Sequence, residues 1–480
     1  MAAIITEKFR THSAKQFIED FGEGTSSTYM FIGRPFPWTD DTAPPSPANS
    51  VGEEMDAYSD MVALKKVSSA DVSHALTRRN WDSTGNTIYD QYDHEISASS
   101  TSNASSSSNL YDSRFYVITE DYNVYKCIRT GTDANGVLKA STVKPTGTSS
   151  TALVETSDTG TVTGRGYLWK YMYTVSAADT IKFTTTDFIP VKTIGAKAAL
   201  GGVSDDGSSQ WNVENDAIDG GILHVKVVNG GAGYTASQTH TGVAINGDGS
   251  SAQCTVHTNA SGQVSHITVT NNGTGYRRAS INIDGITGVG TPSTSAVVTP
   301  IISPLYGHGA NPVEELGGNL VMVNSRLEFA EGSGDFPTDN DFRRIGLIQD
   351  PFSTGTTVAT DANYAAYNKM TLSSVTGLSV DDIIRDANAD GSGVAVSRIV
   401  SISGNVVSHI PQANSGGTYV NFSATDTVYK GSSSIGTVSS VDSSFPEIVK
   451  YSGNIMYVEN RGAVTRAADQ IEDIKLIIQM

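Results

Sequence analysis

The sequence predicts a mainly β protein, with a layered β-sandwich core, a few short helices in loops, and two small β-rich inserted domains. Glycine is frequent, at 47 of 480 residues, and long helical runs of Ala, Leu, Glu and Lys are rare. Short stretches of alternating apolar residues recur along the chain, as expected of half-buried strands. Two regions also repeat themselves internally, which indicates stacked strand-turn units.

The first 200 residues provide the first part of the predicted core. Ser13 stands three residues before Gln16, a capping-box pattern that predicts a helix beginning there. The apolar residues that follow predict these elements in order: a strand at 29–32, a proline-rich loop at 35–47, helical spacing at 55–62, a serine-rich surface loop at 96–109, and strands at 115–118, 123–128 and 167–173.

Residues 201–300 form the first predicted insertion. The segment that ends in Gly233-Tyr234 recurs 42 residues later and ends in Gly275-Tyr276, with a histidine, alternating apolar residues and an asparagine in register. The glycines suit turns that need positive φ, and each tyrosine is expected to begin the next strand. A duplicated β-repeat module is therefore predicted.

Residues 361–445 form the second predicted insertion, a small β-barrel or sandwich. Asp382-Ile383-Ile384 is echoed by Asp426-Thr427-Val428, and both are followed by a Gly/Ser turn and another strand. The core is expected to continue at 301–360, with strands at 319–323 and 345–348, and to end with strands at 446–480. The last two segments, 452–461 and 468–478, read as a terminal hairpin with a charged connection that holds Glu459, Arg461 and Arg466.

Composition disfavours several functional classes. The formal net charge of −18 opposes binding to nucleic acid and to anionic membranes. The two cysteines, Cys127 and Cys254, allow neither a disulfide framework nor a zinc site by themselves, and they are expected to be buried thiols in a reducing compartment. The N-terminus lacks the features of a signal peptide, and no apolar window is long enough to span a membrane.

One short segment resembles half of a calcium-binding loop. Asp386, Asn388 and Asp390 alternate before Gly391, but Ser397 occupies the place of the bidentate glutamate, and the flanks read as strands. We interpret the segment as a hairpin turn and keep these three residues as a weak metal candidate. His224 and His266, at equivalent repeat positions, are interpreted as strand residues because a metal site needs a fuller set of ligands.

No catalytic or cofactor-binding residue is predicted. His308 lies near Glu314 and Glu315, but no nucleophile elbow, P-loop or dinucleotide fingerprint accompanies it. We expect a loop anchored by hydrogen bonds of His308 and Asn311.

Two arginine pairs are predicted to stabilise the fold or an interface. Arg78 and Arg79 precede Trp81 and Asp82, and an Arg–Asp network with Trp81 packing is expected. Arg343 and Arg344 follow Asp339 and Asp341 and are interpreted in the same way. Glu459 and Arg461 are assigned to a similar network.

Several motifs in colinear order resemble those of the baseplate wedge subunit, the gene-eight product, of T-even-type contractile-tailed phages. They lie within 1–195, 301–355 and 446–480, and neither insertion is covered. The motifs are Lys8-Phe9-Arg10, Gly33-Arg34 with Pro37-Trp38, Arg78-Arg79-Asn80-Trp81-Asp82, Tyr125-Lys126-Cys127, Tyr167 to Tyr171, Phe342 to Pro351, and the C-terminal segment. Asn80 stands where the family has Asp.

This resemblance implies a non-enzymatic subunit of the virion tail baseplate, made in the host cytoplasm and longer than the T-even form. It implies a homodimer that binds the other wedge subunits and takes part in the baseplate rearrangement that triggers sheath contraction. The resemblance implies no cofactor. The insertions are expected to bind fibres or accessory proteins. Two alternatives stay open, a receptor- or glycan-binding tail or fibre-associated protein, and a cell-wall hydrolase with a carboxylate pair.

Overall fold

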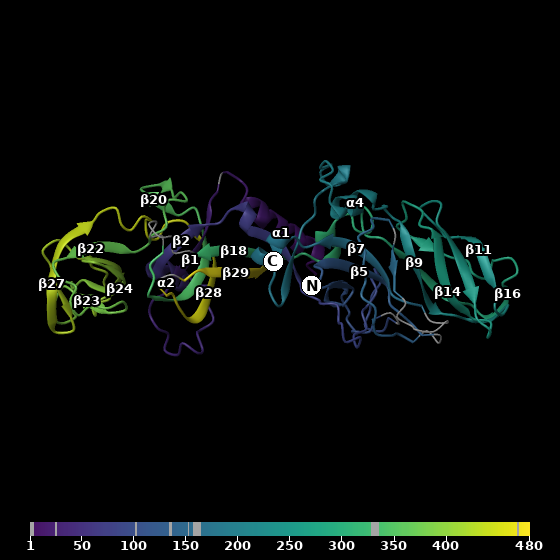
Figure 1. Ribbon diagram of the computed structural model, residues 1–480, viewed down its shortest axis with the longest axis horizontal. Helices are drawn as coiled ribbons and strands as arrows, with labels where there is room; N and C mark the ends of the chain where they lie inside the picture. The colour runs from purple at the N-terminus through teal and green to yellow at the C-terminus, as the bar shows by residue number, and fades with distance from the viewer. Residues whose placement is uncertain are drawn as a thin grey trace. The chain divides into compact units, whose positions relative to one another are not determined.

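The computed structural model describes residues 4–24, 26–100, 103–133, 137–151, 153–156, 165–327, 336–467 and 470–480. The chain is mainly β, as predicted, with many short strands and few helices (Figure 1). It forms two compact units: unit 1 comprises Met1–Lys15, Ser73–Met322 and Ile477–Met480, and unit 2 comprises Gln16–Val72 and Val323–Leu476. The division into five segments stays a prediction.

The first helix begins earlier than the sequence indicated. Helix α1 spans Glu7–Asp20, and the Thr6 hydroxyl oxygen accepts a 3.3 Å bond from the Phe9 backbone N–H at its start. The predicted capping box is wrong, because Ser13 lies inside the helix and its hydroxyl donates to the carbonyl of Phe9.

The other α-helices are short. Helix α2 is capped by Ser50, whose hydroxyl accepts from the Glu53 N–H, and it ends at Asp60, so Met61 and Val62 belong to the following strand instead of the predicted helix. Within the described residues, no helix is long and apolar enough to cross a membrane. The helices are α2 (Val51–Asp60), α3 (Ala177–Phe183), α4 (Ser209–Asp216) and α5 (Pro312–Leu316).

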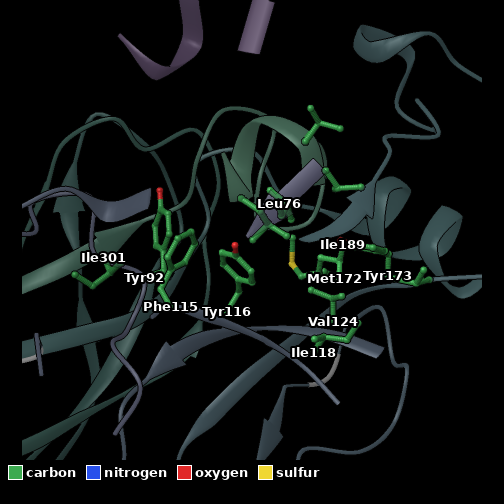
Figure 2. Packing of buried hydrophobic residues seen from close by; sticks show 14 residues of the cluster. Leu76, Tyr92, Phe115, Tyr116, Ile118, Val124, Met172, Tyr173, Ile189 and Ile301 are labelled. Carbon is green, nitrogen blue, oxygen red and sulfur yellow. The ribbon is translucent and has the colours of Figure 1, made fainter. Parts of the chain in front are cut away.

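An antiparallel sheet in unit 1 separates two hydrophobic clusters. Its order is β4-β5-β7-β6, from β4 (Tyr116–Ile118), β5 (Asn123–Arg129), β7 (Leu168–Thr174) and β6 (Val154–Glu155). Val124 of β5 packs in one cluster, with Phe115 and Met172 (Figure 2), whereas its neighbour Tyr125 packs in the other, with Trp169. This alternation fits the period of a strand that is buried on both faces, and the three strands predicted here are confirmed.

A second four-stranded sheet has the order β29-β18-β3-β8. Its strands are β3 (Val72–Thr77), β8 (Phe188–Val191), β18 (Leu320–Leu327) and β29 (Glu472–Gln479). Strands β3 and β8 are antiparallel, with His74 opposite Val191. The predicted strand near 319–323 is therefore present.

The repeat region of unit 1 has small sheets around its own hydrophobic core. Its strands are β9 (Ile222–Asn229), β10 (Ala232–Tyr234), β11 (Thr239–Ala244), β12 (Asn246–Gly247), β13 (Gln253–Thr258), β14 (Val264–Asn271), β15 (Ala279–Ser280), β16 (Gly290–Thr294) and β17 (Val297–Ile302). Strand β9 pairs with β17, and β13 lies between β11 and β14. Buried side chains from these strands form one cluster.

The two repeats have equivalent turns. Gly231 and Gly273 have φ of 66° and 60°, and each donates its N–H to the asparagine two residues earlier. Tyr234 and Tyr276 are both buried. Tyr234 ends β10 and Tyr276 lies outside any strand, so the prediction that each begins a strand is wrong.

Unit 2 contains a sheet with the order β2-β1-β19-β28. Its strands are β1 (Thr28–Gly33), β2 (Met61–Lys66), β19 (Asp341–Gln349) and β28 (Asn454–Thr465). Gly346 in β19 is required by close packing, because a Cβ there would lie 2.4 Å from the Phe31 ring. A separate hairpin joins β20 (Phe352–Thr354) to β21 (Thr357–Val358).

A closed six-stranded barrel follows in unit 2. Its order is β22-β25-β24-β23-β26-β27, from β22 (Asn368–Leu372), β23 (Ile383–Arg385), β24 (Val396–Ser403), β25 (Val406–Gln412), β26 (Thr427–Lys430) and β27 (Ser433–Asp442). The echoed segments form like turns: Asp382 accepts from the Ser379 N–H at 2.7 Å, and Asp426 accepts from the Ser423 N–H at 2.6 Å.

The two predicted C-terminal strands are present, but they do not pair as the predicted terminal hairpin. Strand β28 pairs with β19, whereas β29 belongs to the sheet that contains β18. Glu459 and Arg461 lie within β28, so the charged connection is shorter than expected and holds Arg466 alone of the three. Ala468 and Asp469 of the predicted second strand lie outside the described residues. The error is physical in origin, because two adjacent strands in sequence need not pair when each has a better partner elsewhere.

Candidate functional site

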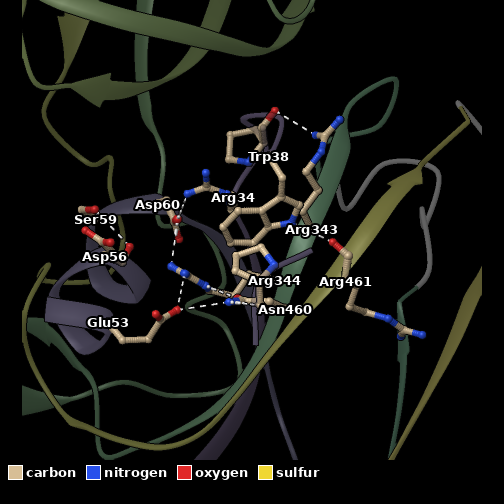
Figure 3. Close-up of polar contacts among 12 residues, drawn as sticks. Arg34, Trp38, Glu53, Asp56, Ser59, Asp60, Arg343, Arg344, Asn460 and Arg461 are labelled. Carbon is tan, nitrogen blue, oxygen red and sulfur yellow. Dashed lines mark hydrogen bonds and ion pairs between the residues drawn. The ribbon is translucent and has the colours of Figure 1, made fainter. Parts of the chain in front are cut away.

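Two neighbouring residues of β19 lie in an arginine cluster. We define this cluster as Arg34, Trp38, Glu53, Asp60, Arg343, Arg344 and Asn460, all labelled in Figure 3, together with Asp41, which bonds to Arg343. Arg343 and Arg344 are only 5% and 1% exposed, although both carry a charge. Arg343 lies where the β19–β28 register shifts, and Arg344 lies opposite Asn460. The two side chains have different sets of acceptors.

Arg344 bonds to two acids and one amide. Its Nη1 lies 3.0 Å from Asp60 Oδ2, its Nη2 lies 2.6 Å from Glu53 Oε1, and its Nε donates to Asn460 Oδ1 at 3.0 Å. Asn460 stands directly opposite Arg344 in the β19–β28 register. These charge-assisted bonds offset the cost of burying the guanidinium.

Arg343 is held mainly by Asp41. Its Nε and Nη2 lie 2.9 and 2.8 Å from Asp41 Oδ2, its Nη2 also lies 3.0 Å from Asp341, and its Nη1 donates to the carbonyl of Pro35. Bonding to Arg343 holds the pKa of Asp41 below its ordinary value. The predicted contact with Asp341 is present, but the main partner comes from the loop near residue 40.

Trp38 lies against the same cluster. The Arg34 guanidinium carbon is 3.6 Å from the centre of the indole ring, and the indole N–H donates to the carbonyl of Arg461 at 2.8 Å. Arg34 also reaches Asp60 at 3.7 Å. Burial raises the pKa of the Asp60 carboxyl to about 7, against the opposing pull of Arg344 and Arg34.

Glu459 and Arg461 lie on a more exposed part of β28. Their side chains are 3.5 Å apart and are 36% and 44% exposed. The buried ion pair in this part of the chain joins Arg466 to Glu472, a partner that the sequence did not indicate. Arg466 is fully buried, and it donates to both oxygens of Glu472 at 3.0 Å and to the carbonyl of Pro337.

Within the chain, Arg78 and Arg79 have partners other than Asp82, and a role of this segment at an interface stays a prediction. Arg78 donates to Asn80 and to the Thr185 carbonyl, and Arg79 donates to the Tyr111 and Asp112 carbonyls. The Asp82 carboxylate instead accepts from the residues that follow it, at 84, 86 and 87. Trp81 packs as expected, beside the cluster that contains Trp169, and its indole N–H donates to Ser141.

A second buried ionic group was missed by sequence reasoning. Lys126 of β5, which is fully buried, contacts both Glu315 of α5 and His308 in the preceding loop. Glu315 also accepts from the Gly309 N–H at 2.7 Å. Burial lowers the pKa of Lys126, and burial together with Lys126 lowers the pKa of His308 well below 6.5, so His308 is neutral. The signal was a lysine inside an aromatic strand.

The weak metal candidates act as turn acceptors. Asp386 accepts from the Ala395 N–H at 3.0 Å, and Asp390 accepts from the Ser415 N–H at 3.1 Å. Asn388 lies in the same β23–β24 connection. In the described part of the chain, no group of three or more His, Cys, Asp or Glu residues converges as a metal site would require.

The structure also shows where the cysteines and the repeat histidines lie. Cys127 and Cys254 are buried free thiols. His224 and His266 lie in β9 and β14 and are partly buried. Asn311 caps α5 by accepting from the Glu314 N–H, and it accepts the Thr193 hydroxyl, so the loop near His308 is anchored as expected.

The chain is similar to known phage baseplate proteins in its N-terminal part. Residues 3–227 match the family model described as Bacteriophage T4, Gp8. The chain is also 30% identical over 213 residues to the baseplate wedge protein gp8 of Enterobacteria phage T4. That alignment covers 39% of this chain and 60% of the T4 protein.

The chain therefore resembles the gene-eight product through its N-terminal part. The matched range includes Arg34, Trp38, Asp60 and the 78–81 segment, and it runs into β9. Arg343, Arg344 and Asn460 lie beyond it. The arginine cluster thus joins matched residues to β19 and β28, which the family match does not reach.

Proposed function

We propose that this protein is a non-enzymatic structural subunit of a phage tail baseplate wedge. The observation that carries the proposal is the match of residues 3–227 to the Gp8 family, supported by 30% identity to a protein named as a baseplate wedge component. We place the protein in the tail baseplate of the virion, and in the host cytoplasm during assembly.

The arginine cluster supports a wedge core that extends beyond the matched range. Asp60 and Glu53 are acids within the matched part, and their shared cation is Arg344, almost 300 residues away. The strands that carry Arg344 and Asn460 complete the sheet around β1. We propose that the core comprises segments near 1–200, 301–360 and 446–480, and that Arg343 and Arg344 stabilise it.

We further propose that the protein is a homodimer, binds the other wedge subunits and takes part in the rearrangement that triggers sheath contraction. A structure of the intact tail tests this. Density for the chain within the baseplate wedge supports the proposal, and density confined to a fibre contradicts it. Light scattering on the purified chain gives a faster test: a dimer supports the wedge assignment, and a trimer favours the fibre-associated alternative.

The repeat module is proposed to bind a fibre or accessory protein, and the structure suggests how to remove it. The Ser303 N–H donates to the Gly221 carbonyl at 3.1 Å, so the two ends of the module meet. Deleting 222–302 and joining Gly221 to Ser303 keeps α4, whose Val213 packs with Trp169.

The deletion should also carry Asp93→Asn, because buried Asp93 pairs with Lys226 of the module. We expect dimerisation and wedge assembly to persist while fibre attachment is lost. The control is Asp93→Asn in the full chain, which should retain fibre attachment. Failure of the deleted chain to dimerise while the control dimerises would contradict an accessory role.

A further inference from the structure

A cavity of about 260 Å³ lies in unit 1, beside the repeat strands β9 and β14. It is lined by side chains of the repeat and by residues around β5, and the polar ones are almost all hydrogen-bond donors or bases. No acidic residue is among the described residues that line it. The residues that matter here are Gln91, Arg129, Arg165, His224, Lys226 and His266.

The duplication builds one wall of this cavity. The Ile222 N–H donates to the Asn272 carbonyl, and the Val264 N–H donates to the Gly230 carbonyl, so β9 and β14 run side by side and antiparallel. Val225 and Ile267 are buried in the core of the module. Because strand side chains alternate, the histidines at 224 and 266 lie on the opposite face, toward the cavity.

Two arginines provide the facing wall. Arg129 is 7% exposed and donates from Nη2 to the Gly166 carbonyl at 2.9 Å, which holds its guanidinium in place. Arg165 Nη1 lies 3.4 Å from Thr268 Oγ1 of β14. A planar guanidinium suits bidentate binding of a carboxylate or phosphate.

Burial and nearby cations both lower the pKa values of the two histidines. Burial, then Arg129, Arg165 and Lys226, lower the pKa of His224 well below 6.5. Burial, then Arg165, His257 and Arg129, lower the pKa of His266 to about 4. Lys226 forms an ion pair with buried Asp93, so the charge of the Asp93 carboxylate is already balanced by Lys226.

Gln91 gives independent support. It is 3% exposed and lines the cavity, yet its amide nitrogen has no hydrogen-bond partner among the described residues. Leaving a buried donor unpaired destabilises the fold, so such groups usually have a partner. A ligand with acceptor oxygens would supply one.

We propose that this cavity binds an oxyanion, the phosphate or carboxylate group of a small molecule. Arg129 and Arg165 would bind its oxygens, Gln91 would donate from its amide, and His224 and His266 would donate ring N–H groups. The volume admits a ligand larger than the anionic group alone. The proposal is independent of the wedge assignment.

Calorimetric titration of the full-length protein with inorganic phosphate and with citrate, at matched ionic strength in chloride, tests the site. Saturable binding of either anion is expected, and it distinguishes a phosphate from a carboxylate ligand. Arg165→Gln and Gln91→Leu should each weaken binding at least tenfold. Arg277→Gln is the matched control, because Arg277 lies in the same module but is exposed and paired with Asp219.

Absence of binding to both anions would overturn the proposal, as would equal weakening by Arg277→Gln. A second measurement does not depend on the variants. Because an anion favours imidazolium, saturating ligand should raise the pKa of His266, followed by NMR, above its value in chloride. An unchanged His266 titration while anion binds would place the ligand elsewhere and also overturn the proposal.

Discussion

Each compact unit buries a cluster of charged residues, and the two clusters use different cations. In unit 2, Arg344 is shared by Glu53, Asp60 and Asn460, each on a separate donor nitrogen. In unit 1, Lys126 contacts Glu315 and His308 at a single ammonium. Both cations are almost completely buried.

The difference between a guanidinium and an ammonium determines how each cluster can respond when one of its groups is changed. A guanidinium stays protonated and directs five donors in a fixed plane, so its acceptors must be placed around it. An ammonium can lose its proton when buried, and Lys126 lies beside a neutral histidine and a carboxyl. We expect the arginine cluster to depend on each of its acceptors, because the charge of Arg344 cannot be removed. We expect the lysine cluster to respond to a change by gaining or losing protons.

The largest expected effect is that of Arg344→Ala. It leaves Asp60 and Glu53 without their shared cation, and breaking a buried pair costs about 3–5 kcal/mol. Urea unfolding, with hydrogen exchange in β19 to locate the change in unit 2, measures the loss. Arg461→Ala, at a 44% exposed side chain, is the control and should change stability by less than about 0.5 kcal/mol. Equal losses would show that the cluster does not stabilise unit 2.

Lys126→Met should destabilise unit 1 by less, about 2–3 kcal/mol, because Glu315 can take up a proton when its cation is removed. Hydrogen exchange in β5 reports the loss. The double variant Lys126→Met with Glu315→Gln should recover at least half of it, since both charges are gone. A double variant as unstable as the sum of the single variants would show that the two residues act independently.

Acidification should change the contributions of Asp60 and His308 to stability in opposite directions. The pKa of Asp60 is about 7 in the fold against 3.8 ordinarily, so the folded state binds the proton and Asp60 contributes more to the stability of unit 2 as pH falls from 7 toward 4. His409 in the same unit opposes this contribution, because burial lowers its pKa to about 3. The pKa of His308 lies well below 6.5, so the unfolded state binds the proton and the stability of unit 1 falls below pH 6.5. Hydrogen exchange at pH 7 and 5.5, corrected for intrinsic rates, separates the two.

The matched controls for this pH response are Asp60→Asn and His308→Gln. On acidification, unit 2 of the full chain should gain stability relative to unit 2 of Asp60→Asn, and unit 1 should lose stability relative to unit 1 of His308→Gln. The other histidines with lowered pKa values, His409, His224 and His266, remain in both variants, so their contributions cancel in these comparisons. A pH response that is the same with and without the substitution would contradict the assigned proton state.

Asn460→Ala should have the smallest effect, about 1 kcal/mol, because it removes one of the three acceptors of Arg344. The shift of the urea midpoint measures it. Added to Arg344→Ala, the same change should cost almost nothing more, since the bond is already lost. Full additivity of the two changes would show that Asn460 stabilises β28 by another route.

Much of the local structure was predictable. The strands around 29–32, 123–128 and 345–348 follow from apolar alternation, and the repeat turns follow from glycines that need positive φ. The Ser13 capping box failed because the same residue type also bonds backward inside a helix. The terminal hairpin failed because alternation shows that a segment is a strand but not which strand it pairs with.

The charged sites were less predictable. Arg343 and Arg344 were predicted to join an ionic network because acids precede them in the sequence, but their partners Asp41, Glu53 and Asp60 were not predicted. Lys126 was read as part of an aromatic strand, and its contact with Glu315 spans 189 positions of the chain. The similarity of residues 3–227 to the Gp8 family was visible in short motifs.

The sequence by itself determined the mainly β class, the positions of many strands, the two internally repeated regions and the resemblance to a baseplate wedge subunit. These depend on side-chain period and turn conformation, which are properties of neighbouring residues. Only the tertiary structure decided which strands pair, which arginine meets which acid, and that the repeat histidines line a cavity with Arg129 and Arg165. Those choices depend on which distant groups are buried together, because a buried charge requires a partner wherever the fold supplies one.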